Sequence, residues 1–151
     1  MLILGSGVGL CGIMCHHLGS SNVLLTDGDS SVLKILQRNI ETNEIHNDSD
    51  VIHSSTIQCQ QLVWGKNLNE LDQKFNVIIA ADCLYMKKSV IPFFETVHHF
   101  LSDDGMLIYI MVSASQSPVE YVLEVASTKH LVWELDGDSV YIFRRSKCTV
   151  V

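Results

Sequence analysis

The length, composition and charge of this chain exclude several classes of protein. A chain of 151 residues with 47% hydrophobic and 18% charged side chains can bury a core, so we expect one folded domain over residues 1–151 and not a disordered chain. The formal net charge of −7 is the reverse of the basic surface that a non-specific nucleic-acid binder carries, and we therefore expect no nucleic-acid partner.

Cysteine usage and the apolar start of the chain bear on the compartment. The five cysteines include no CxxC pair, which predicts reduced thiols in the cytoplasm, with the nucleus as a second compartment, and neither a disulfide framework nor a metal site. The N-terminal run has no Lys or Arg before Lys34 and is interrupted by glycines. This pattern favours neither a signal peptide nor a membrane span, so we expect no membrane partner.

The first part of the chain alternates apolar, β-prone runs with helical patterns. The strands are predicted over Met1–Leu4, Val23–Thr26 and Thr56–Leu62. One helix is predicted over Leu10–Leu18. A second helix, capped by Ser30 or Ser31, is predicted from apolar residues at helical spacing, namely Val32, Leu33, Leu36 and Ile40. The polar stretch Glu44–Ser55 predicts a loop.

The second part continues the alternation and ends differently. A polar connection, Gly65–Lys74, precedes a buried strand over Phe75–Ala80. A helix is then predicted over Val90–Leu101, with Pro92 in its first turn, followed by a turn at Ser102–Gly105. A strand over Met106–Val112 and a helix over Val119–Ser127 come next. The turn signal Asp136-Gly137-Asp138 then joins strands over Leu131–Leu135 and Ser139–Arg144. Together these elements predict an α/β fold whose sheet is mostly parallel, with an antiparallel C-terminal strand and helices on both faces.

A glycine run lies between the first strand and the first helix. In Gly5-Ser6-Gly7-Val8-Gly9 the missing Cβ atoms let the backbone turn sharply and approach a ligand, and the helix that follows directs free N–H groups at the run. A plain tight turn would have the same pattern. Open α/β sheets bind ligands at the carboxyl ends of their strands, so the run predicts a cofactor site.

Asp27 strengthens this prediction. It lies 18 residues after Gly9, at the end of the second strand, where a carboxylate accepts hydrogen bonds from a ribose diol. The alternative is that Asp27 caps the next helix. A second frame, Gly7-Val8-Gly9-Leu10-Cys11-Gly12, matches the dinucleotide fingerprint GxGxxG, so an NAD-binding oxidoreductase is a competing interpretation.

The end of the fourth strand carries the motif Ala80-Ala81-Asp82-Cys83-Leu84-Tyr85. With this motif the chain resembles the seven-β-strand protein-lysine methyltransferases of the Asp-x-x-Tyr group, methyltransferase family 16, which includes the calmodulin-lysine and elongation-factor-2-lysine enzymes. The resemblance covers nearly the whole chain. The matching segments are Leu4-Gly5-Ser6-Gly7-Val8-Gly9-Leu10, Leu25-Thr26-Asp27, Leu62-Val63-Trp64-Gly65 and Asp82-Cys83-Leu84-Tyr85, together with the terminal hairpin Leu131–Arg144.

The resemblance implies a Rossmann-like methyltransferase sheet, S-adenosyl-L-methionine as cofactor and a lysine side chain of a protein as substrate. It assigns cofactor-binding roles to the residues Gly5, Gly7, Gly9, Asp27, Trp64 and Ala81, with Asp27 at the ribose and Trp64 against the adenine. It assigns catalytic roles to Asp82 and Tyr85, which would flank the methyl-transfer channel and orient the amine. Without the resemblance, Asp82 would be interpreted as a helix cap, Tyr85 as a packing residue and Trp64 as a half-buried aromatic at a strand end.

Two features depart from the family pattern. Ile3 stands where the family has an acidic residue, two places before the first glycine, and the N-terminal segment that precedes this strand in the family is expected to be missing from the chain. These departures motivate one alternative, a non-catalytic methyltransferase-like interaction module. A small-molecule methyltransferase is a further alternative. We expect a monomer.

Overall fold

The computed structural model describes residues 1–43, 55–111 and 118–147. They divide into two compact units, Met1–Val63 and Trp64–Val151. The loop predicted over Glu44–Ser55 lies, apart from Ser55, outside the described residues. The expectation of a single domain stays a prediction.

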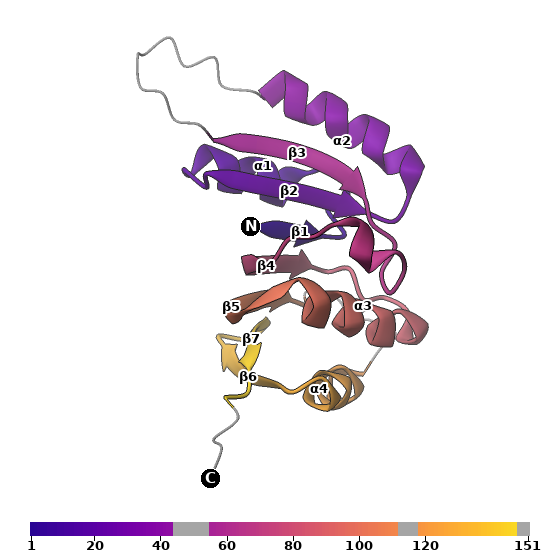
Figure 1. Cartoon of the computed structure of the whole chain (residues 1–151), viewed down its shortest axis with the longest axis vertical. Helices are drawn as coiled ribbons and strands as arrows, with labels where there is room; N and C mark the ends of the chain where they lie inside the picture. Colours follow the sequence, from indigo (N-terminus) through magenta and orange to yellow (C-terminus); the bar gives the residue numbers. More distant parts are fainter. Residues whose placement is uncertain (44–54, 112–117, 148–151) are drawn as a thin grey trace. The chain divides into compact units, whose positions relative to one another are not determined.

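The first unit contains a parallel sheet in the order β3-β2-β1, drawn from indigo to magenta in Figure 1. Its elements are β1 (Leu2–Leu4), α1 (Leu10–His17), β2 (Asn22–Asp27), α2 (Ser30–Asn43) and β3 (Thr56–Gln61). The strands and helices predicted for this part of the chain are therefore confirmed, with ends that differ by one or two residues.

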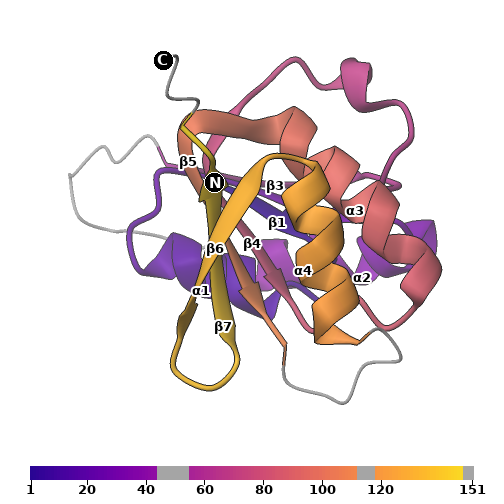
Figure 2. The same ribbon diagram turned by 90° about the horizontal axis from the view of Figure 1, so that it is seen from below.

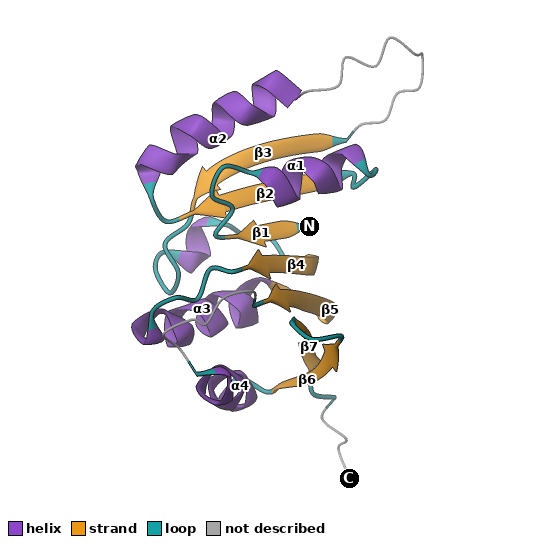
Figure 3. Ribbon diagram, turned by 180° about the vertical axis from the view of Figure 1, so that it is seen from behind, coloured by secondary structure: helices purple, strands orange, loops and turns teal. Residues whose placement is uncertain are grey.

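The packing of the first unit follows from its apolar positions. Leu25 of β2 is fully buried, and α2 packs its buried Leu36 and Ile40 against β2 and β3. Helix α1, which crosses in front of β2 in Figure 3, comes close to that strand because Gly12 has no side chain. A Cβ at Gly12 would lie 2.6 Å from Cγ of Leu25, which is far inside van der Waals contact.

The cap predicted for α2 is wrong by one or two residues. Asp29, not Ser30 or Ser31, caps this helix: Oδ1 of Asp29 accepts hydrogen bonds from N of Ser31 at 2.8 Å and from Oγ of Ser31 at 2.7 Å. A carboxylate directly before the first helical residue can accept from the free N–H groups of the first turn, whereas Ser30 and Ser31 already lie inside the helix.

The second unit contains a mixed sheet in the order β4-β5-β7-β6 (Figure 1). Its elements are the 3-10 helix η1 (Leu68–Glu70), then β4 (Phe75–Ala81), α3 (Lys87–Phe100), β5 (Leu101–Ile110), α4 (Val119–Thr128), β6 (Leu131–Asp136) and β7 (Val140–Arg145). Strand β5 is parallel to β4 and antiparallel to β7, and β7 is antiparallel to β6. The prediction of a parallel arrangement that ends in an antiparallel hairpin is confirmed.

Helix α3 begins earlier than predicted. It starts at Lys87 instead of Val90, so Pro92 lies inside the helix and not in its first turn. The exposed polar start of the helix lacks the apolar periodicity on which the prediction depended. The missing N–H of Pro92 leaves the carbonyl of Lys88 without its usual intrahelical donor.

The turn predicted at Ser102–Gly105 is also wrong. Strand β5 begins at Leu101, directly after α3, and runs through these residues. Its pairing with β4 shifts register there, since Phe75 lies opposite Leu101 whereas Val77 lies opposite Met106. The polar residues that resemble a turn in sequence form a bulge in the strand, while the buried Leu101 keeps the strand attached at its start.

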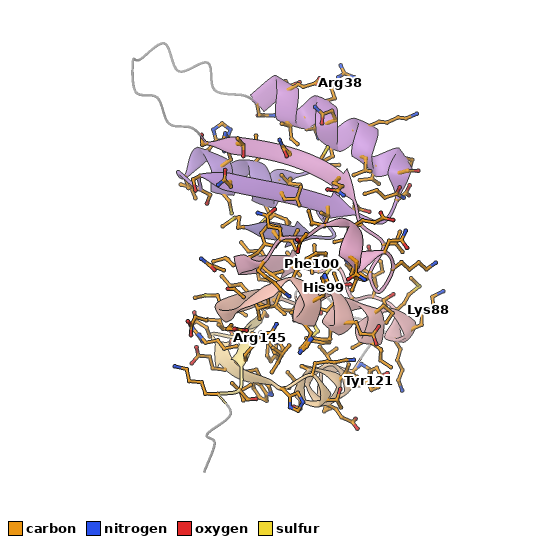
Figure 4. The ribbon with its side chains drawn as sticks, in the orientation of Figure 1. Arg38, Lys88, His99, Phe100, Tyr121 and Arg145 are labelled. Carbon is orange, nitrogen blue, oxygen red and sulfur yellow. The ribbon has the colours of Figure 1, made fainter. Side chains whose placement is uncertain are left out.

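A cluster of rings and one arginine hold the hairpin to α3. Phe94 of α3 packs its ring edge-on against Phe143 of β7, with centroids 5.5 Å apart, and both are fully buried. Arg145, labelled in Figure 4, ends β7. Its Nη2 donates to the backbone oxygens of His98 at 2.7 Å and Leu101 at 2.9 Å. These contacts fix the hairpin on the helix. No helix within the described ranges is long and apolar enough to cross a membrane.

Candidate functional site

The glycine run adopts a backbone conformation that residues with a side chain rarely adopt. Gly5, Gly7 and Gly9 have φ angles of 67°, 53° and 97°, all in the left-handed half of conformational space. The run leaves β1 after Leu4 and enters α1 at Leu10. Helix α1 has no side-chain cap, so its first N–H groups remain available to a ligand.

Neighbouring residues hold the run in place. Ser6 and Thr26 exchange two hydrogen bonds, from N of Ser6 to O of Thr26 at 2.8 Å and from N of Thr26 to Oγ of Ser6 at 2.9 Å. On the other side, Nδ2 of Asn39 on α2 donates to O of Val8 at 2.8 Å. These positioning roles were not predicted from the sequence. Ser6 and Thr26 stand inside the motifs and could have been suspected, but a lone asparagine on a helix gives no such signal.

Asp27 connects the end of β2 to the glycine run. Oδ2 of Asp27 accepts a hydrogen bond from N of Gly7 at 3.0 Å, and Oδ1 accepts one from N of Asp29 at 3.0 Å. Because Asp29 caps α2, the alternative of Asp27 as the cap of that helix is removed. A carboxylate can accept about four hydrogen bonds, so the half-buried Asp27 retains acceptor capacity for a ligand hydroxyl.

The glycines are required for different reasons. A Cβ at Gly9 would lie 2.4 Å from Cδ1 of Leu36, so Gly9 is fixed by packing inside the unit. A Cβ at Gly7 would meet no atom within 4 Å. Gly7 is therefore free of internal packing demands and faces open space. Gly12 allows α1 to approach Leu25, which is also the role of the last glycine in the dinucleotide fingerprint, so this contact does not distinguish the two frames.

Ile3 is part of the core. Its side chain is 3% exposed, and its backbone oxygen accepts a hydrogen bond from Oγ1 of Thr26 at 2.7 Å. The position that is acidic in the family thus contributes apolar packing and a carbonyl acceptor, and brings no charge to the glycine run.

In the second unit, Asp82 and Tyr85 follow the end of β4. Asp82 has a left-handed φ of 46°, which is unusual for a residue other than glycine, and its N donates to O of Ile110 at 2.8 Å. Because Met86 is the N-cap of α3, Asp82 is not a helix cap. Tyr85 is 60% exposed, so it is not a packing tyrosine. Both structural alternatives are therefore removed. Ala81 ends β4 and is exposed.

Tyr109 lies near this segment and was not predicted as a site residue from the sequence. It is 1% exposed and stands on β5 opposite Ala80. Burial, and after it the neighbouring Cys83 and Asp82, raises the pKa of Tyr109 well above its usual value. The phenol therefore stays neutral and keeps its proton. A tyrosine within a strand gives no sequence signal for this position.

Trp64 is fixed against α3. Its ring meets Phe93 edge-on with centroids 5.1 Å apart. Next to it, N of Gly65 donates to Oγ1 of the buried Thr96 at 2.9 Å, and Oγ1 of Thr96 donates to O of Pro92 at 2.8 Å. A Cβ at Gly65 would lie 3.0 Å from Cβ of Pro92, so the chain passes close to the helix at this glycine. Trp64 is half-buried, which leaves part of its ring accessible.

The predicted site residues therefore form two sets. Gly5, Gly7, Gly9 and Asp27 belong to the first unit, where the structure brings Asp27 into contact with Gly7. The set of the second unit is Trp64, Ala81, Asp82 and Tyr85. Within the described parts of the chain, no group of three or more His, Cys, Asp or Glu residues could hold a metal ion.

Comparison with known proteins gives consistent results. The sequence model of a family described as lysine methyltransferase matches residues 1–128. The chain is 33% identical over 87 residues to a calmodulin-lysine N-methyltransferase of Arabidopsis thaliana, covering 56% of this chain and 27% of that protein. It is 30% identical over 106 residues to the protein N-lysine methyltransferase METTL21A of Danio rerio, covering 70% of this chain and 45% of that protein. The chain thus spans less than half the length of these relatives.

Among solved structures, a TehB-like SAM-dependent methyltransferase from Corynebacterium glutamicum aligns with a TM-score of 0.72 at 18% identity, covering 95% of this chain and 79% of that one. The fold is that of a Rossmann-like methyltransferase, as the strand order, the glycine run and the alignment with this solved structure show. With the family match over residues 1–128, the chain belongs to the lysine methyltransferase family.

Proposed function

We propose that this protein is an S-adenosyl-L-methionine-dependent protein-lysine N-methyltransferase. The observation that carries the proposal is the contact between Asp27 and Gly7, which joins the acidic end of β2 to an open glycine run. Family membership and the names of the relatives, which are lysine methyltransferases, support the same conclusion.

The residues of the first unit fit the cofactor. Gly7 leaves room for a ligand because a Cβ there would meet nothing within 4 Å, and the uncapped start of α1 offers N–H donors for a carboxylate. Asp27 has acceptor capacity left for ribose hydroxyls. We assign Gly5, Gly7 and Gly9 to the methionine part of the cofactor and Asp27 to its ribose.

In the second unit, Trp64 and Ala81 are also assigned cofactor-binding roles. The ring of Trp64 is held by Phe93 and by the anchored backbone of Gly65, so it offers a fixed aromatic surface for the adenine. Ala81 is exposed at the end of β4, where a small side chain leaves space for a ligand.

Asp82 and Tyr85 are proposed to handle the target lysine. When bound, the cofactor supplies an electrophilic methyl group on a sulfonium. The protein must hold the lysine amine in position and without its proton, and a free lysine has a pKa of about 10.4. The carboxylate of Asp82 and the hydroxyl of Tyr85 can accept hydrogen bonds from the amine and orient it. The neutral Tyr109 near Asp82 keeps its proton and adds no charge to the site.

The proposed partner is a protein with an accessible lysine. We further propose that the protein acts as a monomer in the cytoplasm and also in the nucleus. The thiols of Cys11, Cys15 and Cys59, which form no disulfide, support a reducing compartment.

Calorimetric titration with S-adenosylhomocysteine tests the cofactor assignment, with NADH as the competing ligand. We expect binding of S-adenosylhomocysteine and none of NADH. The reverse result would assign the glycine run to a dinucleotide and refute the proposal. The buried Ile3 favours a second candidate, a non-catalytic interaction module, because the run lacks the acidic neighbour of the family. That candidate predicts no heat with either ligand.

A further inference from the structure

Strand β6 is an open edge of the sheet in the second unit. Among the described strands it pairs with β7 alone. The two strands form the yellow hairpin in Figure 2. The hydrogen bond from N of Ser146 to O of His130, 2.8 Å long, sets the phase of this antiparallel ladder. Alternation then directs the backbone N–H and C=O groups of Leu131, Trp133 and Leu135 away from β7.

Three exposed side chains of this strand are apolar. Val132, Trp133 and Leu135 are 54%, 44% and 49% exposed, and the strand is exposed along its length after Leu131. Soluble proteins protect such edges with lysine, proline or a covering element. Strand β6 contains neither lysine nor proline, and among the described strands only β7 pairs with it, so its outward backbone groups can pair with another extended chain.

Charge indicates what kind of chain would pair here. The strand and its turn carry Glu134, Asp136 and Asp138 but no Lys or Arg. Glu134 is paired with Arg144 at 2.6 Å, whereas no ion pair is found for Asp136 or Asp138 among the described residues. Two copies of β6 side by side would bring these acidic groups together, which disfavours a second copy of the chain. A basic segment is complementary.

The hairpin turn between β6 and β7 lies at the same end of the sheet as Asp82, namely the end at which β4 and β5 finish. N of Asp82 donates to O of Ile110 at the end of β5, and N of Met111 donates to O of Ser139 at 3.0 Å. A chain added beside β6 would stand four strand spacings from β4, or roughly 19 Å at about 4.8 Å per spacing. An extended peptide covers that distance in about six residues.

We propose that β6 docks an extended segment of the protein substrate that alternates apolar residues with lysine or arginine, about six residues from the target lysine. The segment pairs with the outward backbone of Trp133 and Leu135, and its cations face Asp136 and Asp138. This docking site rests on the proposed function for its role in methylation, but the binding step can be measured without it.

A fluorescein-labelled ten-residue peptide of alternating lysine and valine is the binding probe, with the glutamate–valine peptide as its counterpart. We expect the lysine peptide to bind and the glutamate peptide to bind at least tenfold more weakly. Leu135→Pro removes an outward N–H without changing the charge, and should weaken binding of the lysine peptide at least tenfold. Leu135→Lys should do the same, and it serves as the second variant if the proline prevents folding.

Ile35→Lys is the matched control, because Ile35 on α2 is 52% exposed and receives the same new charge. Ile35→Lys should change the affinity for the lysine peptide less than twofold. Equal binding of both peptides, or unchanged affinity in both Leu135 variants, would overturn the proposal. A dimer of the free chain that Leu135→Pro abolishes would overturn it too, since the edge would then serve a second copy.

Calorimetry separates this proposal from the proposed function. Leu135→Pro should bind S-adenosylhomocysteine with unchanged affinity. If the chain binds the lysine peptide at β6 but no S-adenosylhomocysteine, the docking edge stands and the methyltransferase proposal fails. If it binds S-adenosylhomocysteine and methylates peptides equally well whether or not they carry the basic segment, the docking proposal fails while the methyltransferase stands.

Discussion

Replacing Gly7 and Gly9 by alanine, one at a time, should separate packing from cofactor binding. At Gly9 the new Cβ would lie 2.4 Å from Leu36 and 3.2 Å from Ile13, at a φ of 97° that alanine rarely adopts. Overpacking costs about 1–3 kcal/mol, and a disfavoured backbone conformation costs about 1–3 kcal/mol more. Gly9→Ala should therefore lower the free energy of unfolding by roughly 2–6 kcal/mol, a large share of the 5–15 kcal/mol of a typical domain.

Gly7→Ala has a different expected result. The φ of 53° lies in the left-handed helical region, and the new Cβ meets nothing within 4 Å, so the cost to folding is only about 1 kcal/mol. The methyl group would nevertheless occupy the space that we assign to the cofactor, and S-adenosylhomocysteine binding should weaken at least tenfold.

Urea denaturation and calorimetry measure the two effects in the same preparations. If the free energy of unfolding of Gly9→Ala, measured in urea, lies within about 1 kcal/mol of that of the parent, the packing argument is refuted. A Gly7→Ala variant that binds S-adenosylhomocysteine as tightly as the parent would show that this glycine does not face the cofactor.

Three further predictions concern single contacts. Asp29→Ala removes the cap of α2 and should lower the urea concentration at the midpoint of unfolding. Asp82→Asn should leave S-adenosylhomocysteine affinity unchanged in calorimetry but reduce methyl transfer at least a hundredfold, because the amide cannot hold the target amine as the carboxylate does. Thr96→Val leaves the N–H of Gly65 without its acceptor and should cost about 1–3 kcal/mol in the same denaturation assay.

Each of these predictions has a control. Asp29→Ser keeps a capping oxygen and should recover most of the stability lost in the alanine variant. Thr96→Ser keeps the hydroxyl that accepts from Gly65, and a loss equal to that of Thr96→Val would show that the hydroxyl does not matter. Retained methyl transfer in Asp82→Asn would remove the role assigned to Asp82.

The sequence predicted the elements well where one side of each element faces a core. The apolar runs at β1, β2 and β4 and the helical spacing in α2 correspond to buried positions, so periodicity located them. The predictions failed where polar residues lie within a strand or helix and were interpreted as a loop or as its end. Ser102–Gly105 forms a bulge within β5 because the buried Leu101 continues the strand before it.

The candidate site was predicted by motif, and its supports were not. Asp27, Asp82 and the glycine run stand at strand ends, where topology concentrates ligand contacts. The residues that hold them, such as Asn39 and Thr96, act through hydrogen bonds across long separations in sequence. No local pattern encodes such a contact, because the partner becomes a neighbour only after folding.

Transfer of a labelled methyl group tests the central claim most directly. The purified chain is incubated with methyl-labelled S-adenosylmethionine and a cell lysate, the proteins are hydrolysed, and the labelled amino acids are identified. We predict label in methylated lysine, and its loss with Asp82→Asn. Label in another amino acid, label in small molecules alone, or no transfer would contradict a protein-lysine methyltransferase.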